Sequence, residues 1–145
     1  LTNSLFTATG SPTFDDFLSM IGDQIDLKGW QNFSAGLDTK GNSTGKHSVY
    51  TKFRDYEIML HVSTLLPFND EDTQQLERKR HIGNDIVVII FIDGKNTFNP
   101  ALIKSVFNHV VVVVTPVNNG NSNTKEQSYK VEIVTKEGVL ASEPV

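Results

Sequence analysis

The stretch from Arg78 to Phe91, RKRHIGNDIVVIIF, places chemically capable side chains directly before an unbroken apolar run. A helix that ends at Gly83, with basic residues at the negative end of its dipole, would explain part of this pattern. It would not explain why so polar a segment keeps a histidine and an asparagine at its end. The residues that could act on a ligand or a partner here are Arg78, Lys79, Arg80, His81 and Asn84.

A second stretch, GNSTGKHS from Gly41 to Ser48, resembles a phosphate-binding P-loop. That motif needs four residues between its glycines and a Ser or Thr directly after its lysine. Here three residues separate the glycines, and His47 follows Lys46. We therefore predict a loop that shapes the surface, and not a nucleotide-binding loop.

The other polar residues match no familiar catalytic or metal-binding pattern. None of the four histidines has metal-ligand spacing, and no nucleophile elbow is present. The chain has no cysteine, which excludes disulfides and thiolate chemistry. The carboxylates of Asp70 to Asp72 suit the first turn of a helix, so they need no catalytic role. We predict no metal site, and hydrogen-bonded structural roles for His61 and His109.

Composition limits the class of protein. The 145 residues can form one domain with a core, and the hydrophobic and charged fractions, 38% and 21%, are those of a globular protein. The net charge of −4 argues against a nucleic-acid binder, and no apolar run is long enough to span a membrane. The basic cluster at residues 78–80 suggests an acidic partner surface. The missing secretory signal and missing cysteines lead us to expect a cytoplasmic location.

Hydrophobic periodicity and capping residues predict mixed helices and strands after a loose segment over residues 1–11. Three helices are predicted, which start at Ser11-Pro12, near Asp70 and at Asn99-Pro100. The apolar face of the first helix extends to Ile25. The predicted strands cover residues 48–53, 57–63, 85–92, 109–114 and 129–135. The strand at 85–92 is continuously apolar, so we expect it to be covered on both faces. The sequence predicts one α/β domain over residues 12–145, with a mixed central β-sheet flanked by helices.

The segment KHSVYTKFRDYEIMLHVSTLLPFNDEDTQQLERKRHIGNDIVVIIF, from Lys46 to Phe91, closely resembles the core of the Rap GTPase-activating protein family. The earlier GWQNFSAGLDTKGNSTG and the later NTFNPALIKSVFNHVVVVV fit the same family's order. The resemblance covers roughly residues 12–135. The related activators directed at Ral and Rheb share similar elements, but QLERKRHIGNDIV is more similar to the Rap-directed branch.

The resemblance implies a G-domain-like catalytic domain of RapGAP type, which accelerates GTP hydrolysis by a Rap-like small GTPase in its GTP-bound form. It implies that Asn84 is the catalytic residue, an asparagine thumb that enters the partner's active site. Lys79, Arg80, His81 and Arg78 are then expected to bind the partner or position the thumb. The protein would complete the active site of another protein and would need no cofactor, because GTP and magnesium belong to the partner.

Two alternatives stay open at this point. The chain could be a docking module that binds a small GTPase without stimulating it, or an activator of Ral-type or Rheb-type GTPases. The tail EGVLASEPV departs from the family pattern, so we expect the C-terminal part of the domain to be truncated or divergent. Homodimerisation of a full-length protein, and its recruitment to membranes by regions outside this chain, are left open by the resemblance.

Overall fold

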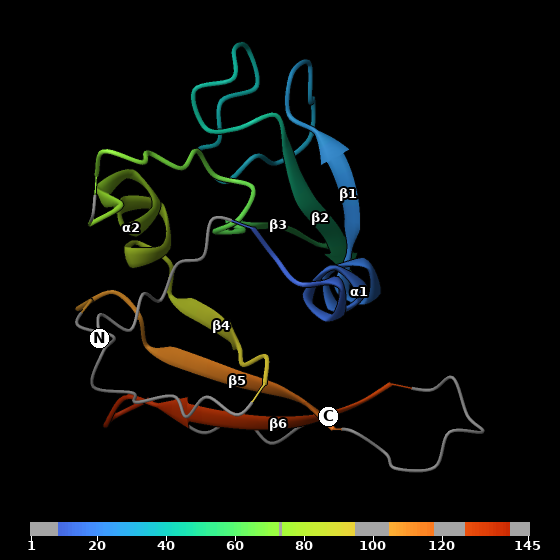
Figure 1. The fold of residues 1–145 in the computed structure, drawn as a ribbon, viewed down its shortest axis with the longest axis vertical. Coiled ribbons are helices and arrows are strands. Elements are labelled where there is room, and N and C mark those ends of the chain that lie inside the picture. Colours follow the sequence, from blue (N-terminus) through green and yellow to red (C-terminus); the bar gives the residue numbers. More distant parts are fainter. Residues whose placement is uncertain (1–8, 73, 95–104, 118–126, 140–145) are drawn as a thin grey trace. The chain divides into compact units, whose positions relative to one another are not determined.

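The computed structural model describes residues 9–72, 74–94, 105–117 and 127–139. The chain divides into two compact units, Leu1–Ile82 and Gly83–Val145, which are described separately. The first unit contains helices α1 and α2 and strands β1 to β3, and the second contains strands β4 to β6 (Figure 1). Among the described residues, no helix has the length and apolar character that a membrane crossing requires.

Helix α1 (Pro12–Ile21) begins where the sequence predicts. The Ser11 hydroxyl accepts a hydrogen bond from the Phe14 backbone N–H at 3.2 Å, and Pro12 occupies the first helical position. The predicted apolar face extended to Ile25, but the helix ends at Ile21 and Ile25 lies in the following strand. The chain leaves the helix at Gly22, where the backbone is extended, and a side chain at this position would collide with the Tyr50 backbone.

The first unit is built on an antiparallel sheet of strands β1 (Asp23–Asp26), β2 (His47–Phe53) and β3 (Tyr56–Leu60), in that order (Figure 1). The predicted hairpin is present, although β3 ends at Leu60 rather than at Ser63. Leu27, Leu37, Tyr50, Met59 and Leu66 form the buried core of this unit.

Helix α2 (Leu76–Gly83) starts later than the predicted position near Asp70. Asp72 explains the shift, because its carboxylate accepts the backbone N–H groups of Gln74 and Leu76 at 2.9 and 2.7 Å. Gln75 has a left-handed backbone, with φ of 49°, and its side-chain amide donates to the carbonyls of Asn69 and Asp72. The segment before Leu76 is therefore a side-chain-stabilised turn instead of a helix.

The second unit contains a mixed sheet in the order β4-β5-β6, which confirms the predicted sheet type. Strand β4 (Val87–Phe91) is parallel to β5 (Val110–Val117), and β5 is antiparallel to β6 (Ser128–Thr135). Val87 and Ile89 remain 50% and 43% exposed, so the expectation that this strand is covered on both faces is wrong for the described structure.

Most of the predicted helix that starts at Asn99-Pro100 lies outside the described residues. Val106 and Phe107, at the described end of this segment, are exposed.

Candidate functional site

Arg78 has the opposite environment from the one expected of a surface arginine. It is 1% exposed, and its guanidinium donates to the carbonyls of Leu66 and Pro67 at 2.9 and 3.1 Å. The same group lies 4.8 Å from the centre of the Phe68 ring. Burial lowers the pKa of Arg78, but an arginine keeps its charge even then. Arg78 therefore holds the loop over residues 66–68 against α2.

This placement corrects one part of the sequence prediction. A side chain that is 1% exposed cannot contact a partner protein directly without rearrangement of the loop. Of the two roles expected for Arg78, the structure is compatible with positioning and argues against partner contact.

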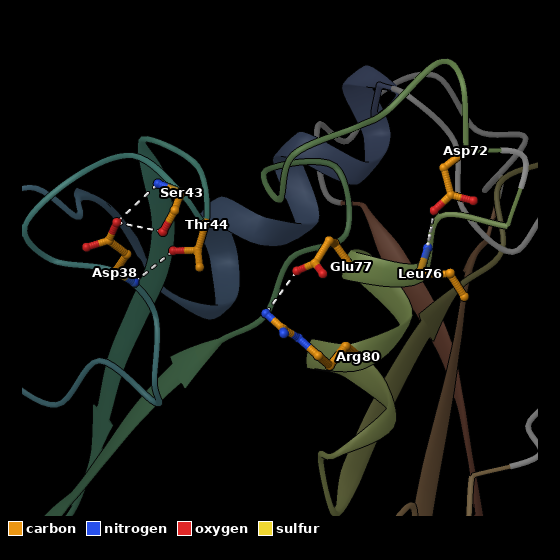
Figure 2. A network of polar contacts seen from close by, with 7 residues as sticks. All are labelled: Asp38, Ser43, Thr44, Asp72, Leu76, Glu77 and Arg80. Carbon is orange, nitrogen blue, oxygen red and sulfur yellow. Dashed lines mark hydrogen bonds and ion pairs between the residues drawn. The ribbon is translucent and has the colours of Figure 1, made fainter.

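Lys79 and Arg80 are exposed on α2. Arg80 pairs with Glu77, one helical turn earlier, at 2.9 Å, and both side chains are more than 60% exposed (Figure 2). Such an exposed pair contributes little to folding. Both cations are thus accessible to an acidic surface.

His81 is half-buried and faces His61, the residue that follows β3. Its ring meets that of His61 edge to face, with the ring centres 5.3 Å apart. The Nε2 atom of His61 lies 3.0 Å from the Ala35 carbonyl oxygen, so the hydrogen-bonded role predicted for His61 is confirmed. Ile82, the next residue, packs against the core cluster. The last turn of α2 is therefore fixed to its own unit by His81 and Ile82.

Asn84 follows α2 in the chain and is exposed in a turn at the start of the second unit. The carbonyls on its two sides are both held within that unit. The Ser105 hydroxyl donates to the Gly83 carbonyl, and the Asn108 side-chain amide donates to the Asp85 carbonyl, each at 2.5 Å. The structure thus combines an exposed carboxamide with a backbone that is restrained before and after it.

The glycine-rich loop has a different electrostatic arrangement. The Asp38 carboxylate accepts the backbone N–H groups of Lys40, Gly41 and Ser43 at 2.9, 2.9 and 3.1 Å, and the Ser43 hydroxyl at 2.6 Å. Figure 2 shows the bonds from Ser43. These hydrogen bonds, the one from Gly41 foremost, hold the pKa of Asp38 well below its usual range. In a P-loop such N–H groups bind phosphate, whereas here the Asp38 carboxylate accepts them.

Among the residues that the structure describes, no group of three or more His, Asp or Glu side chains could hold a metal ion. The site residues predicted from sequence lie close together in the chain, between Arg78 and Asn84, but have different surroundings. Arg78 is buried, His81 is half-buried, and Lys79, Arg80 and Asn84 are exposed. Ser105 and Asn108 were not predicted. They bond to carbonyls 22 and 23 residues away, which no local pattern signals.

Comparison with known proteins identifies the class. The Rap/ran-GAP family profile matches residues 4–145, and the chain belongs to this family. A PH and Rap-GAP domain-containing protein of Dictyostelium discoideum is 52% identical over 130 residues. The human GTPase-activating Rap/Ran-GAP domain-like protein 3 is 47% identical over 133 residues. Each match covers 90% of this chain, and the chain spans 11% and 12% of the length of these relatives.

A solved structure gives the fold of the chain. The structure of the TSC2 GAP domain matches with a TM-score of 0.84 and 31% sequence identity, over 97% of this chain and 75% of that chain. The predicted fold class, a mixed α/β domain of the G-domain-like GAP type, is therefore confirmed.

Proposed function

We propose that this chain is a GTPase-activating domain for a Rap-like small GTPase and that Asn84 supplies the catalytic group. The observation that carries the proposal is the exposed Asn84 carboxamide on a backbone held at both neighbouring carbonyls. A group that must enter another protein's active site needs this combination of exposure and restraint. The family, and relatives whose names describe GTPase activation, support the reaction class.

The chemistry requires only that water be oriented. GTP hydrolysis needs an attacking water in line with the γ-phosphate, and in Ras-type proteins a glutamine of the GTPase orients it. A carboxamide has an acceptor oxygen and two donor hydrogens, so it can fix both the position and the orientation of that water. An aspartate at position 84 would lose the donors and add negative charge beside the phosphates.

The residues of α2 have supporting roles in this proposal. Lys79 and Arg80, both exposed, bind acidic groups of the GTPase and raise the rate of encounter. His81 fixes the end of the helix through His61, and Arg78 fixes its preceding loop. None of these four side chains needs to reach the phosphates.

GTP and magnesium belong to the partner, so the chain itself needs no cofactor. Its place of action is cytoplasmic, where such GTPases meet GTP.

The experiment is single-turnover GTP hydrolysis by a Rap-type GTPase loaded with GTP, with and without the chain. We expect an acceleration on the order of 10³-fold to 10⁵-fold, as for other activators that act in trans. Asn84→Ala should remove it and leave the thermal midpoint within about 2 °C, because an exposed side chain contributes little to folding. Asn32→Ala, at another exposed asparagine, is the control.

The two alternatives predict other results. Binding of the GTPase without any acceleration by the wild-type chain would indicate a docking module. Acceleration of a Ral-type or Rheb-type GTPase, but not of the Rap type, would keep the mechanism and change the partner. The restrained Asn84 favours an activator over a docking module, because docking alone needs no fixed carboxamide.

A further inference from the structure

We infer that Ser105 and Asn108 are positioning residues, which hold the Asn84 backbone in the geometry that activation requires. The inference rests on the proposed function. It assigns a role to two side chains that lie more than 20 residues from Asn84 in the chain and belong to the same unit.

The Ser105 hydroxyl both accepts and donates a hydrogen bond. Its hydroxyl oxygen accepts the Phe107 backbone N–H at 3.1 Å, and its proton is donated to the Gly83 carbonyl. Since the accepted bond fixes the direction of the remaining groups, the hydroxyl proton has one favourable orientation. The carbonyl that it holds belongs to the peptide bond whose nitrogen is that of Asn84.

Asn108 restrains the other side. It is 4% exposed, and its amide donates to the Asp85 carbonyl. Directly beyond it, the backbone N–H groups of His109 and Val110 donate to the Ile86 carbonyl at 2.8 and 3.1 Å, where the parallel pairing of β4 and β5 begins. The backbone after Asn84 is therefore attached to the sheet by three bonds in succession.

Lys136 in turn anchors the segment that provides Ser105. Its ammonium donates to the carbonyls of Ser105 and Val106 at 2.8 and 2.9 Å, and its backbone N–H donates to the His109 carbonyl at 2.9 Å. Residues 105–109 are thus fixed to the end of β6 as well as to the Asn84 turn. The turn is thus restrained by Ser105, Asn108 and Lys136, while the Asn84 side chain remains exposed.

The expected effect is on catalysis more than on binding. Loss of one bond to a partly exposed turn leaves the sheet intact but lets the Asn84 peptide shift. A displacement of about 1 Å of a catalytic group can cost on the order of 100-fold in rate. The exposed cations of α2 would still bind the GTPase, so the half-saturating concentration of the chain should hardly change.

The test compares Ser105→Ala, Ser105→Thr and Gln127→Ala in the full chain, each titrated against GTP-loaded Rap-type GTPase in single turnover. Ser105→Ala should lower the maximal stimulated rate about 10-fold to 100-fold, with the half-saturating concentration within about 2-fold of wild type. Ser105→Thr keeps the hydroxyl and should recover most of the rate. Gln127→Ala is the matched control, because its amide also donates to two carbonyls but at the other end of the β5–β6 pair.

A double-variant cycle decides whether Ser105 and Asn108 act on the same turn. If they do, Ser105→Ala and Asn108→Ala together should lower the maximal rate by less than the product of the two single losses, whereas independent effects would multiply. An unchanged maximal rate in Ser105→Ala, or an equal loss of rate in Gln127→Ala, would overturn the inference. The proposed function would still stand in that case if the wild-type chain stimulated GTP hydrolysis. Lack of stimulation by wild type would overturn both. Asn108→Ala alone is a second probe and should also lower the maximal rate with little change in the half-saturating concentration.

Discussion

Two polar turns of this molecule use hydrogen bonds in opposite ways. In the glycine-rich loop, the Asp38 side chain accepts hydrogen bonds from three backbone N–H groups and a hydroxyl. The loop's own side chain therefore satisfies these donors. Around Asn84, other side chains satisfy the backbone, and the Asn84 side chain is left exposed. The first turn uses its best functional group to stabilise its own shape. The second is stabilised by its neighbours and can offer its functional group to a partner.

The two arginines of α2 repeat this contrast within one helix. Arg78 is buried on loop carbonyls, whereas Arg80 is exposed beside Glu77. Positions two apart on a helix face different sides, so one arginine can stabilise the fold while the other meets a partner. Substitutions at these positions separate folding from binding.

The largest of these effects is expected at Arg78. Arg78→Ala leaves the carbonyls of Leu66 and Pro67 without their donor and removes the contact with the Phe68 ring. We expect the free energy of unfolding to fall by about 2–4 kcal/mol. Chemical denaturation measures this. A loss below about 0.5 kcal/mol would contradict a structural role for Arg78.

Substitution of Arg80 is expected to have a smaller effect, and this effect concerns binding of the GTPase and not folding. Arg80→Ala should change the free energy of unfolding by less than about 0.5 kcal/mol, because exposed ion pairs contribute little. The half-saturating concentration in GTPase stimulation should rise about 3-fold to 10-fold, and the difference should shrink at high salt. Lys130→Ala, which breaks the exposed pair with Glu132, is the control. Equal effects of the two variants would argue against a specific role for Arg80.

The smallest effect concerns Asp38 and depends on pH. The pKa of Asp38 is lowered in the folded state, so below about pH 4 the unfolded chain takes up a proton that the folded chain does not. The stability from this carboxylate is therefore present above that pH and is lost as the pH falls. Thermal melts should show the Asp38→Asn variant destabilised at pH 7, with the gap to wild type narrowing under acid. A gap between the two proteins that stayed constant into the acid range would contradict this account.

The sequence predicted those features that depend on nearby residues. Ser11 and Pro12 set the start of α1 through contacts within one turn, and β-branched runs gave the strands of the mixed sheet. The predicted start of α2 near Asp70 was wrong. A turn around Asp72 and the left-handed Gln75 replaces the helix in that segment. The burial of Arg78 depends on carbonyls 11 and 12 residues away, which charge patterning does not reveal.

The candidate site divides in the same way. Asn84 and the exposed cations stood out by residue type and by family resemblance. The side chains that restrain the Asn84 backbone are Ser105 and Asn108, and neither residue type nor spacing distinguishes them. Only the fold brings them beside the turn, because the parallel pairing of β4 and β5 aligns the starts of two distant strands.

The most direct test of the central claim is single-turnover GTP hydrolysis by a Rap-type GTPase with wild-type chain and with Asn84→Asp, at concentrations that saturate binding. Asparagine and aspartate have nearly the same shape, so the comparison isolates the carboxamide. We predict strong acceleration by wild type and at least a 10³-fold lower stimulated rate with Asn84→Asp, at similar melting temperature. Full stimulation by Asn84→Asp would contradict the assignment of Asn84 as the catalytic group.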